Sequence, residues 1–351
     1  MMKRLDSFGA SLFFLLGWLL FLPQSMHAQV ENFYAGKNIR LVVGYGPATA
    51  TDLWARLIAR HISKYIPGSP TMVVQNMPGA TSLIAANHIY AVAKPDGLTL
   101  GVIAPALYFD QLVGLKEVQF DWAKFAYIGS PTRTNEIFFA RTDAPFKSIE
   151  DIRKASVPPK CGATGTASTG YYFPMLMEQT LGTKFNIITG YQGGNDIDLA
   201  IERGEIQCRG FSLNSFFARE PFASWRKKGF VRVLIQSGKD KDPRLPDVPT
   251  IYELMNQYKT PESGRSVATV VLAAGDIGRP FVAPPAISPD TLKILRQAFA
   301  KVVADPEVKA TAEKQELELD PTESEPLQAI AREVVTQPPD VIERMKKLLG
   351  R

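Results

Sequence analysis

The chain has 351 residues, and its 45% hydrophobic and 21% charged side chains are ordinary for a globular protein that buries a core. Its formal net charge of +5 comes from basic residues scattered along the chain, without the clustered Lys and Arg of a nucleic-acid-binding protein, so we expect no nucleic-acid partner. No group of Cys and His has metal-site spacing, which excludes a structural zinc, and we expect neither a metal nor a cofactor.

The first 28 residues have the layout of a secretory signal peptide. Lys3 and Arg4 precede an apolar run at 10–22, and residues 26–28 lie before the expected cleavage point. The apolar run is shorter than the about 20 residues that a membrane span needs. An uncleaved anchor and a lipid-modified start are the alternatives, although no cysteine lies near the cut. We therefore expect export to the periplasm with cleavage of the signal peptide.

Residues 39–65 predict a strand, a loop and a helix in direct succession. The apolar run at 39–43 suits a strand buried on both faces, and the Gly-Tyr-Gly-Pro sequence at 44–47 ends it. Thr51 or Asp52 can cap the helix, in which Asp52 and Arg56 are spaced as an ion pair. Such a unit directs free amides and the positive helix end at a space where an anion can bind. An ordinary strand–helix connection is the alternative.

The same alternation continues along the chain. Strands are predicted at 71–74, 98–103 and 137–140, with helices at about 82–93 and 148–155. Later strands are predicted at 186–189, 206–211, 231–235, 267–273 and 281–283, and later helices at 196–203, 289–304, 306–315, 326–335 and 338–349. Alternating strands and helices imply parallel sheets covered on both faces, with ligands bound beyond the carboxyl ends of the strands.

A second strand–loop–helix unit repeats the design of the first. A strand at 160–164 leads through glycines and hydroxyl residues at 165–170 into a helix at 171–181. Amide and hydroxyl donors therefore converge twice, once in each half of the chain. Three arginines, Arg133, Arg141 and Arg209, are possible charge partners of an anion, but solvation at the surface is the expected role of each.

Two cysteines, Cys161 and Cys208, lie beyond the predicted signal peptide. In an exported protein such a pair can form a disulfide, and two buried free thiols are the alternative. His61 and His88 fall on the apolar sides of different helices, so we expect them to pack and not to bind a ligand.

Several segments together resemble a known family. They are residues 44–47 with Asp52 and 55–57, then 73–80, 85–87 and 95–97, and later 191–194, 203–205 and 245–250. These segments are similar, in the same order, to the exported solute receptors of tripartite tricarboxylate transporters, also called Bug receptors. The resemblance covers nearly all of the chain that follows the signal peptide.

The resemblance implies an α/β fold of the periplasmic binding protein type II-like class, with two doubly wound α/β domains and a ligand cleft between them. The first domain would comprise residues 29–131 and 243–351, and the second residues 132–242. A carboxylate would be held by the first strand–helix loop of each domain, often through ordered waters. The implied ligand-binding residues are Tyr45, Ala48, Thr49, Thr51, Asp52, Gly165, Thr166, Ser168, Thr169, Tyr191 and Gly193.

The sequence departs from the family pattern at 48–51, where Ala-Thr-Ala-Thr replaces the usual glycines. Each added Cβ restricts the backbone and narrows the space for an anion, while two hydroxyls are gained. In one account the loop still holds an anion, with Asp52 turned toward Arg56 and the amides and hydroxyls of 48–51 left for the ligand. In the other account the loop is filled.

The resemblance implies a monomeric receptor that delivers a small organic carboxylate to the permease subunits of a tripartite transporter. A periplasmic sensing module, which presents the ligand to a signalling partner, needs the same closing cleft and is the alternative. A hydrolase is a third possibility, but residues 165–170 lack Gly-x-Ser-x-Gly spacing and neither His61 nor His88 has an evident Ser or Cys partner. We therefore expect no enzymatic activity.

Overall fold

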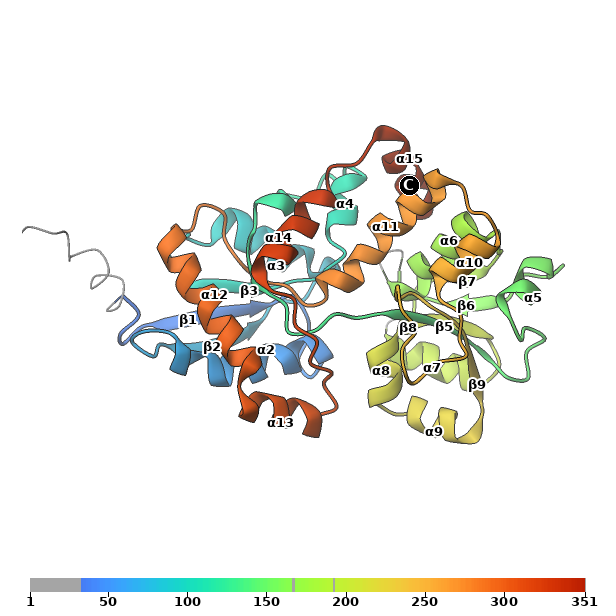
Figure 1. Ribbon diagram of the computed structural model, residues 1–351, viewed down its shortest axis with the longest axis horizontal. Coiled ribbons are helices and arrows are strands. Elements are labelled where there is room, and N and C mark those ends of the chain that lie inside the picture. Colours follow the sequence, from blue (N-terminus) through green and yellow to red (C-terminus); the bar gives the residue numbers. More distant parts are fainter. Residues whose placement is uncertain (1–32, 166–167, 192, 351) are drawn as a thin grey trace, which may run out of the picture.

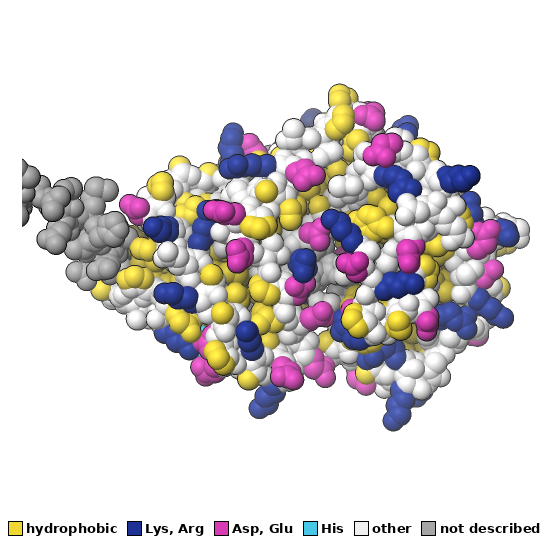
Figure 2. Space-filling model, viewed as in Figure 1, with side chains coloured by type: hydrophobic (Ala, Val, Ile, Leu, Met, Phe, Trp, Pro, Cys, Tyr) yellow, Lys and Arg dark blue, Asp and Glu magenta, His cyan; other side chains and the backbone are white. Residues whose placement is uncertain are grey.

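The computed structural model describes residues 33–165, 168–191 and 193–350. Two lobes, each built on a five-stranded sheet, lie side by side (Figure 1). The predicted signal peptide and Thr166 fall outside the described residues. Within the described ranges, no helix combines the length and the apolar character that crossing a bilayer requires. On the face shown in Figure 2, basic and acidic side chains are interspersed over both lobes.

The first sheet has the strand order β2-β1-β3-β10-β4. Its strands are β1 (Asn38–Val43), β2 (Thr71–Asn76), β3 (Thr99–Val102), β4 (Ala126–Gly129) and β10 (Phe281–Ala283). Along β1, Leu41 and Val43 pack in one apolar cluster with α2 (Ala50–Ile62) and α12 (Pro289–Ala304), whereas Val42 packs in a second cluster with α3 (Leu83–Asn87) and α14 (Ser324–Glu333). The strand is therefore buried on both faces, as its unbroken apolar sequence predicts.

The second sheet has the equivalent order β7-β6-β8-β5-β9. Its strands are β5 (Glu136–Arg141), β6 (Lys160–Gly162), β7 (Asn186–Ile188), β8 (Cys208–Ser212) and β9 (Val231–Gln236). Buried residues of α6 (Thr169–Leu181), α10 (Ile251–Gln257) and α11 (Glu262–Ile277) pack with one side of β5, and those of α7 (Gly194–Glu202), α8 (Leu213–Ala218) and α9 (Phe222–Lys228) pack with the other.

The remaining helices complete both lobes. They are α4 (Tyr108–Leu112), α5 (Ile149–Lys154), α13 (Pro306–Lys314) and α15 (Pro339–Leu348), with short helical turns at Ser63–Tyr65, Ala80–Ser82, His88–Val92 and Trp122–Lys124. The predicted helix at 82–93 is thus divided into α3 and the His88–Val92 turn. Helix α3 begins only at Leu83, because Ala80, Thr81 and Ser82 have positive φ angles, which an α-helix cannot contain.

Both sheets are mixed, which corrects the expectation of parallel sheets. Strand β10 runs antiparallel to β3 and β4, and β5 runs antiparallel to β8 and β9. Each of these strands joins its sheet where the chain has just crossed from the other lobe. A crossing strand enters from the opposite end of the sheet, and local strand–helix alternation carries no information about that direction.

The predicted strand at 267–273 is wrong, because these residues lie inside α11. This helix runs between the lobes and packs against α6, α14 and α15 (Figure 1). It is therefore apolar around most of its circumference, and a short apolar run cannot be assigned to a strand or a buried helix by periodicity. The predicted domain limits, which place α10 and α11 with the first domain, stay a prediction.

Cys161 and Cys208 form a disulfide, the alternative that the sequence left open beside two free thiols. They lie directly opposite each other in the parallel pair β6–β8, with their Cα atoms 4.6 Å apart. Both are fully buried. The disulfide therefore joins two neighbouring strands of the second sheet.

Candidate functional site

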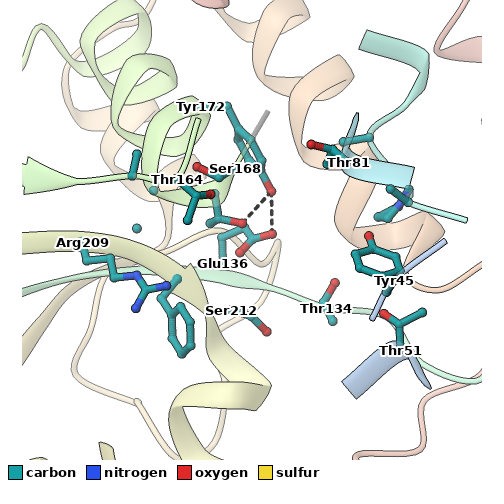
Figure 3. Close-up of a pocket in the computed structure, with 18 of the residues that line it drawn as sticks. Tyr45, Thr51, Thr81, Thr134, Glu136, Thr164, Ser168, Tyr172, Arg209 and Ser212 are labelled. Carbon is teal, nitrogen blue, oxygen red and sulfur yellow. Dashed lines mark hydrogen bonds between the residues drawn. The ribbon is translucent and has the colours of Figure 1, made fainter. Parts of the chain in front are cut away.

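A cavity of about 340 Å³ lies between the two lobes, a size that suits a small organic molecule. The first lobe contributes Tyr45, Thr51, Thr81, Ala104, Pro105 and Ala106, and the chain crossings contribute Thr134, Gly278 and Arg279. The second lobe contributes Glu136, Ala163, Thr164, Ser168, Thr169, Gly170, Tyr172, Ile197, Arg209, Gly210, Phe211 and Ser212. Figure 3 shows side chains from both lobes directed toward this space.

The first loop brings two of its predicted residues, Tyr45 and Thr51, to the cavity wall. Thr49 instead caps α2: its hydroxyl oxygen accepts from the Asp52 amide at 3.3 Å and donates to the Gly46 carbonyl at 2.9 Å. The cap is therefore Thr49, and not Thr51 or Asp52 as the sequence suggested. Because the cap lies two residues before Thr51, the Thr51 side chain is not used for capping and lines the cavity.

Asp52 is 1% exposed and holds the loop together instead of lining the cavity. Its carboxylate accepts from Arg56 Nε at 2.9 Å, from the Ala48 amide at 2.9 Å and from Asn76 Nδ2 at 2.8 Å. Burial opposes ionisation, but these hydrogen bonds outweigh it and lower the pKa of Asp52. The expected Asp52–Arg56 pair is present. The Ala48 amide, however, is taken by Asp52 and is not left for a ligand.

The second loop brings Ser168 and Thr169 to the cavity at the start of α6. Ser168 occupies the N-cap position but its side chain makes no capping bond; its hydroxyl donates to the Gly165 carbonyl at 2.6 Å. The Thr169 hydroxyl lies 3.1 Å from the Tyr172 hydroxyl. Thr166 belongs to this predicted set but lies outside the described residues.

The other predicted site residues lie near the cavity but not in its wall. Ala48, Thr49 and Asp52 form the internal bonds of the first loop, and the Gly165 carbonyl receives Ser168. The Gly193 amide donates to Asp196 at 3.1 Å and so begins α7, while Tyr191 packs against the apolar cluster beneath that helix. Their direct contact with a ligand stays a prediction.

Three arginines were possible charge partners, and only Arg209 lines the cavity. The exposed Arg133 is paired with Asp320, and the half-buried Arg141 is paired with the exposed Asp143. Arg209 is 7% exposed; it bonds Asp198 and the Gly194 carbonyl and stacks on the Phe211 ring. Burial, partly offset by Asp198, lowers its pKa to about 10. It remains charged at neutral pH.

A second cation, Arg279, reaches the cavity from the crossing between α11 and β10. It follows Gly278, whose φ is +67° and where an added Cβ would lie 1.9 Å from the Thr132 carbonyl oxygen. Only glycine therefore permits this close crossing. Burial lowers the pKa of Arg279, whereas Tyr45 and Glu136 favour its charged form. Arg279 therefore brings a second guanidinium to the space between the lobes.

Unpaired polar atoms concentrate around this cavity. In the described part of the chain, ten buried side-chain nitrogen or oxygen atoms lack a hydrogen-bond partner, and four of them belong to cavity residues. These four are Glu136 Oε2, Arg209 Nε, Ser212 Oγ and Arg279 Nε. A buried polar atom without a partner costs about 1–3 kcal/mol. These four atoms are therefore available for hydrogen bonds with a molecule bound in the cavity.

Comparison with known proteins agrees with this geometry. A profile described as "Tripartite tricarboxylate transporter family receptor" matches residues 54–347. The chain belongs to this receptor family. A UPF0065 protein of Cupriavidus necator is 26% identical over 323 residues, which cover 91% of this chain and 90% of that protein.

Solved structures share the receptor's fold. A TctC solute binding protein from Polaromonas has a TM-score of 0.66 at 20% identity, with 90% of this chain and 99% of that chain covered. Two Rhodopseudomonas palustris proteins, one solved with adipate and one with malate, have TM-scores of 0.65 and 0.62 at 19% identity; each match covers 90% of this chain, and 98% and 99% of theirs. The predicted family and the predicted fold, two doubly wound α/β domains of periplasmic binding protein type II-like architecture, are confirmed.

Sequence reasoning missed most of the receptor's cavity wall, and among the residues that it missed are Glu136, Tyr172 and Arg279. Glu136 begins a strand, Tyr172 lies inside a helix, and Arg279 follows a glycine in a crossing, so none belongs to a recognisable loop motif. The one available signal is the Gly278-Arg279-Pro280 sequence between two apolar segments, which places a charge at a forced turn.

Proposed function

We propose that this receptor captures a small organic carboxylate between its lobes and delivers it to the permease subunits of a tripartite tricarboxylate transporter. It would act in the periplasm, after export, as a monomer. The observation that carries the proposal is the polar cavity itself, into which the buried Arg209, the half-buried Arg279 and several hydroxyls converge. The malate and adipate in structures of the same fold support a carboxylate as the ligand class.

The wall residues suggest how a carboxylate would be held. Arg209 and Arg279 would supply charge-assisted hydrogen bonds, and Tyr45, Thr51 and Thr169 would supply hydroxyl donors. Charge-assisted bonds contribute about 1.5–3 kcal/mol each, whereas micromolar affinity needs about 8 kcal/mol. Two arginine contacts and two or three hydroxyl contacts reach that scale before the cost of ordering the lobes is subtracted.

We assign the other predicted residues supporting roles in the same site. Ala48, Thr49 and Asp52 keep the first loop in shape, and Gly165 and Ser168 do the same for the second. Tyr191 and Gly193 support the start of α7, next to Arg209. Thr166 is proposed as a further hydroxyl of the second loop on the basis of the sequence alone.

The experiment is a thermal-shift and calorimetry screen of residues 29–351 against mono-, di-, tricarboxylic and aromatic acids. A ligand that binds only the folded protein adds about 2.7 kcal/mol to the free energy of unfolding at a hundred times its Kd. Amines of similar size that carry no carboxyl group serve as the negative controls. If no acid stabilises the protein, carboxylate capture is refuted.

Delivery to a permease needs its own test. Cells that lack the receptor should lose uptake of the radiolabelled acid, and the intact receptor should restore it. A variant that still binds the acid but carries charge reversals on the exposed lobe surfaces should identify the docking face. Restored growth responses without restored uptake would instead support the sensing alternative.

A further inference from the structure

Glu136 places a buried carboxyl group in the cavity wall. It is the first residue of β5, is 8% exposed, and lies beside Tyr172 in Figure 3. Its Oε1 accepts from the Tyr172 hydroxyl at 2.8 Å, while its Oε2 has no partner among the described residues. Its backbone is also fixed, because the Glu136 amide donates a hydrogen bond to the Ser237 hydroxyl at 2.7 Å. The carboxyl group is therefore held firmly with one oxygen unused.

An acid at this position is unexpected in a site for carboxylates. Two carboxylates at close range repel each other, and the repulsion grows in a cavity from which water is excluded. Packing does not require Glu136, because Gln or Met would fill the same volume. The Oε2 atom can accept a hydrogen bond, but the carboxylate of a ligand has no hydrogen to donate. The partner of Oε2 is therefore a donor group elsewhere on the ligand.

We propose that Glu136 recognises a hydroxyl or ammonium donor on the ligand, so that this receptor selects carboxylates that also carry such a donor. The inference rests on the proposed function and deepens it. Arg209 and Arg279 then receive the ligand's carboxylate, and Glu136 receives its O–H or N–H group within the same cavity. An unsubstituted acid would leave Oε2 without a partner and would bring a second negative charge beside it.

The protonation of Glu136 provides a way to separate the two donor types. Burial raises its pKa to about 7, partly offset by bonds from Tyr172 and Thr169 of α6 and by the charge of Arg279; Ser212 lies opposite on β8 and carries no charge. An ammonium ligand favours the ionised carboxylate, so its affinity should rise as the pH increases from 6 to 8. An unsubstituted acid favours the protonated form, so its affinity should fall over the same range.

The test is calorimetry with linear mono- and dicarboxylic acids of three to six carbons, each in unsubstituted form and with a hydroxyl or amino group at carbon 2 or 3. The tightest-binding acid should carry a donor and should bind at least tenfold more tightly than its unsubstituted parent. Glu136→Met should abolish this ratio. Glu136→Gln, whose amide oxygen still accepts from a hydroxyl, should keep a hydroxyl preference but lose an ammonium preference. Glu117→Gln, at an exposed position, is the matched control.

The possible results distinguish a failure of donor recognition by Glu136 from a failure of carboxylate binding itself. If unsubstituted acids bind as tightly as their substituted forms, or if Glu136→Met keeps the preference, Glu136 does not read a donor and the inference is overturned. If no acid binds the unaltered protein, the proposed function fails first. Should Glu136→Met not fold, Glu136→Leu replaces it as the test of a hydroxyl preference, and survival of an ammonium preference in Glu136→Gln overturns the inference for an ammonium ligand.

Discussion

The Tyr172 hydroxyl donates a hydrogen bond to Glu136 Oε1 at 2.8 Å, from helix α6 to strand β5. It also lies 3.1 Å from the Thr169 hydroxyl, at the start of the same helix. One phenol therefore connects the carboxyl group in the cavity wall to the second loop. Because all three side chains border the cavity, a ligand that displaces one of them alters the environment of the others.

Replacing Tyr172 with Phe should weaken the receptor in two measurable ways. The free energy of unfolding should fall by about 1–3 kcal/mol, because Glu136 loses its donor inside the protein. The pKa of Glu136 should rise further, since the Tyr172 bond lowers it. Urea unfolding and a carboxyl titration by NMR measure the two effects. Tyr171→Phe, one position earlier and half-buried, is the control; an equal loss there would point to general helix damage.

Stability should depend on pH through Glu136. Its pKa is raised from 4.5 to about 7 in the folded protein, so between these values the folded state binds more protons than the unfolded state. The contribution is fully present below pH 4.5 and is lost as the pH rises through 7. Unfolding free energy should therefore fall by roughly 2–3 kcal/mol from pH 4.5 to 7.5 because of this residue. Glu136→Gln should flatten that slope relative to Glu117→Gln; identical slopes would contradict the assignment.

Replacing Arg279 with Met should reduce carboxylate affinity about 10- to 100-fold, the equivalent of one lost charge-assisted hydrogen bond. The side chain lines the cavity and its Nε has no partner among the described residues, so stability should change less than affinity. Calorimetry and thermal unfolding supply the two numbers. The same change at exposed Arg203 should leave affinity unchanged. Unaltered affinity in Arg279→Met would remove this residue from the site.

Thr49 and Thr51 should separate helix capping from ligand contact. Thr49→Ala removes the cap of α2 and should cost about 1 kcal/mol of stability with little change in affinity. Thr51→Ala should leave stability nearly unchanged and weaken ligand binding, since this residue lines the cavity. Chemical unfolding and calorimetry on both variants form a crossed comparison. If Thr51→Ala binds normally, the first loop is filled and does not receive the ligand.

Thiol titration should find no free thiol in the denatured, unreduced protein and two after reduction, because Cys161 and Cys208 are bonded. The double change Cys161→Ser and Cys208→Ser should lower the unfolding free energy by about 2–5 kcal/mol. Reducing agent should destabilise the unaltered protein but not this variant. Two free thiols before reduction would show that the buried cysteines remain separate.

Local sequence patterns predicted correctly those features that depend only on residues close together in the chain. The helix at 289–304 begins with Ser288, whose hydroxyl accepts from the Thr291 amide, and ends where the sequence predicts. The Asp52–Arg56 pair was predicted because four residues span one helical turn. The capping residue of α2 was predicted two or three residues too late, because Thr49, Thr51 and Asp52 can all cap a helix and packing selected Thr49.

The sequence by itself determined the two repeated strand–loop–helix units, most helix limits and the family to which the receptor belongs. Only the tertiary structure decided that 267–273 is helical, that β5 and β10 run antiparallel, and that Glu136 and Arg279 meet at one cavity. The physical reason is sequence distance. Glu136 begins β5 and Arg279 lies in a crossing of the chain 143 residues later, so their charges act on each other only after the two lobes have packed together.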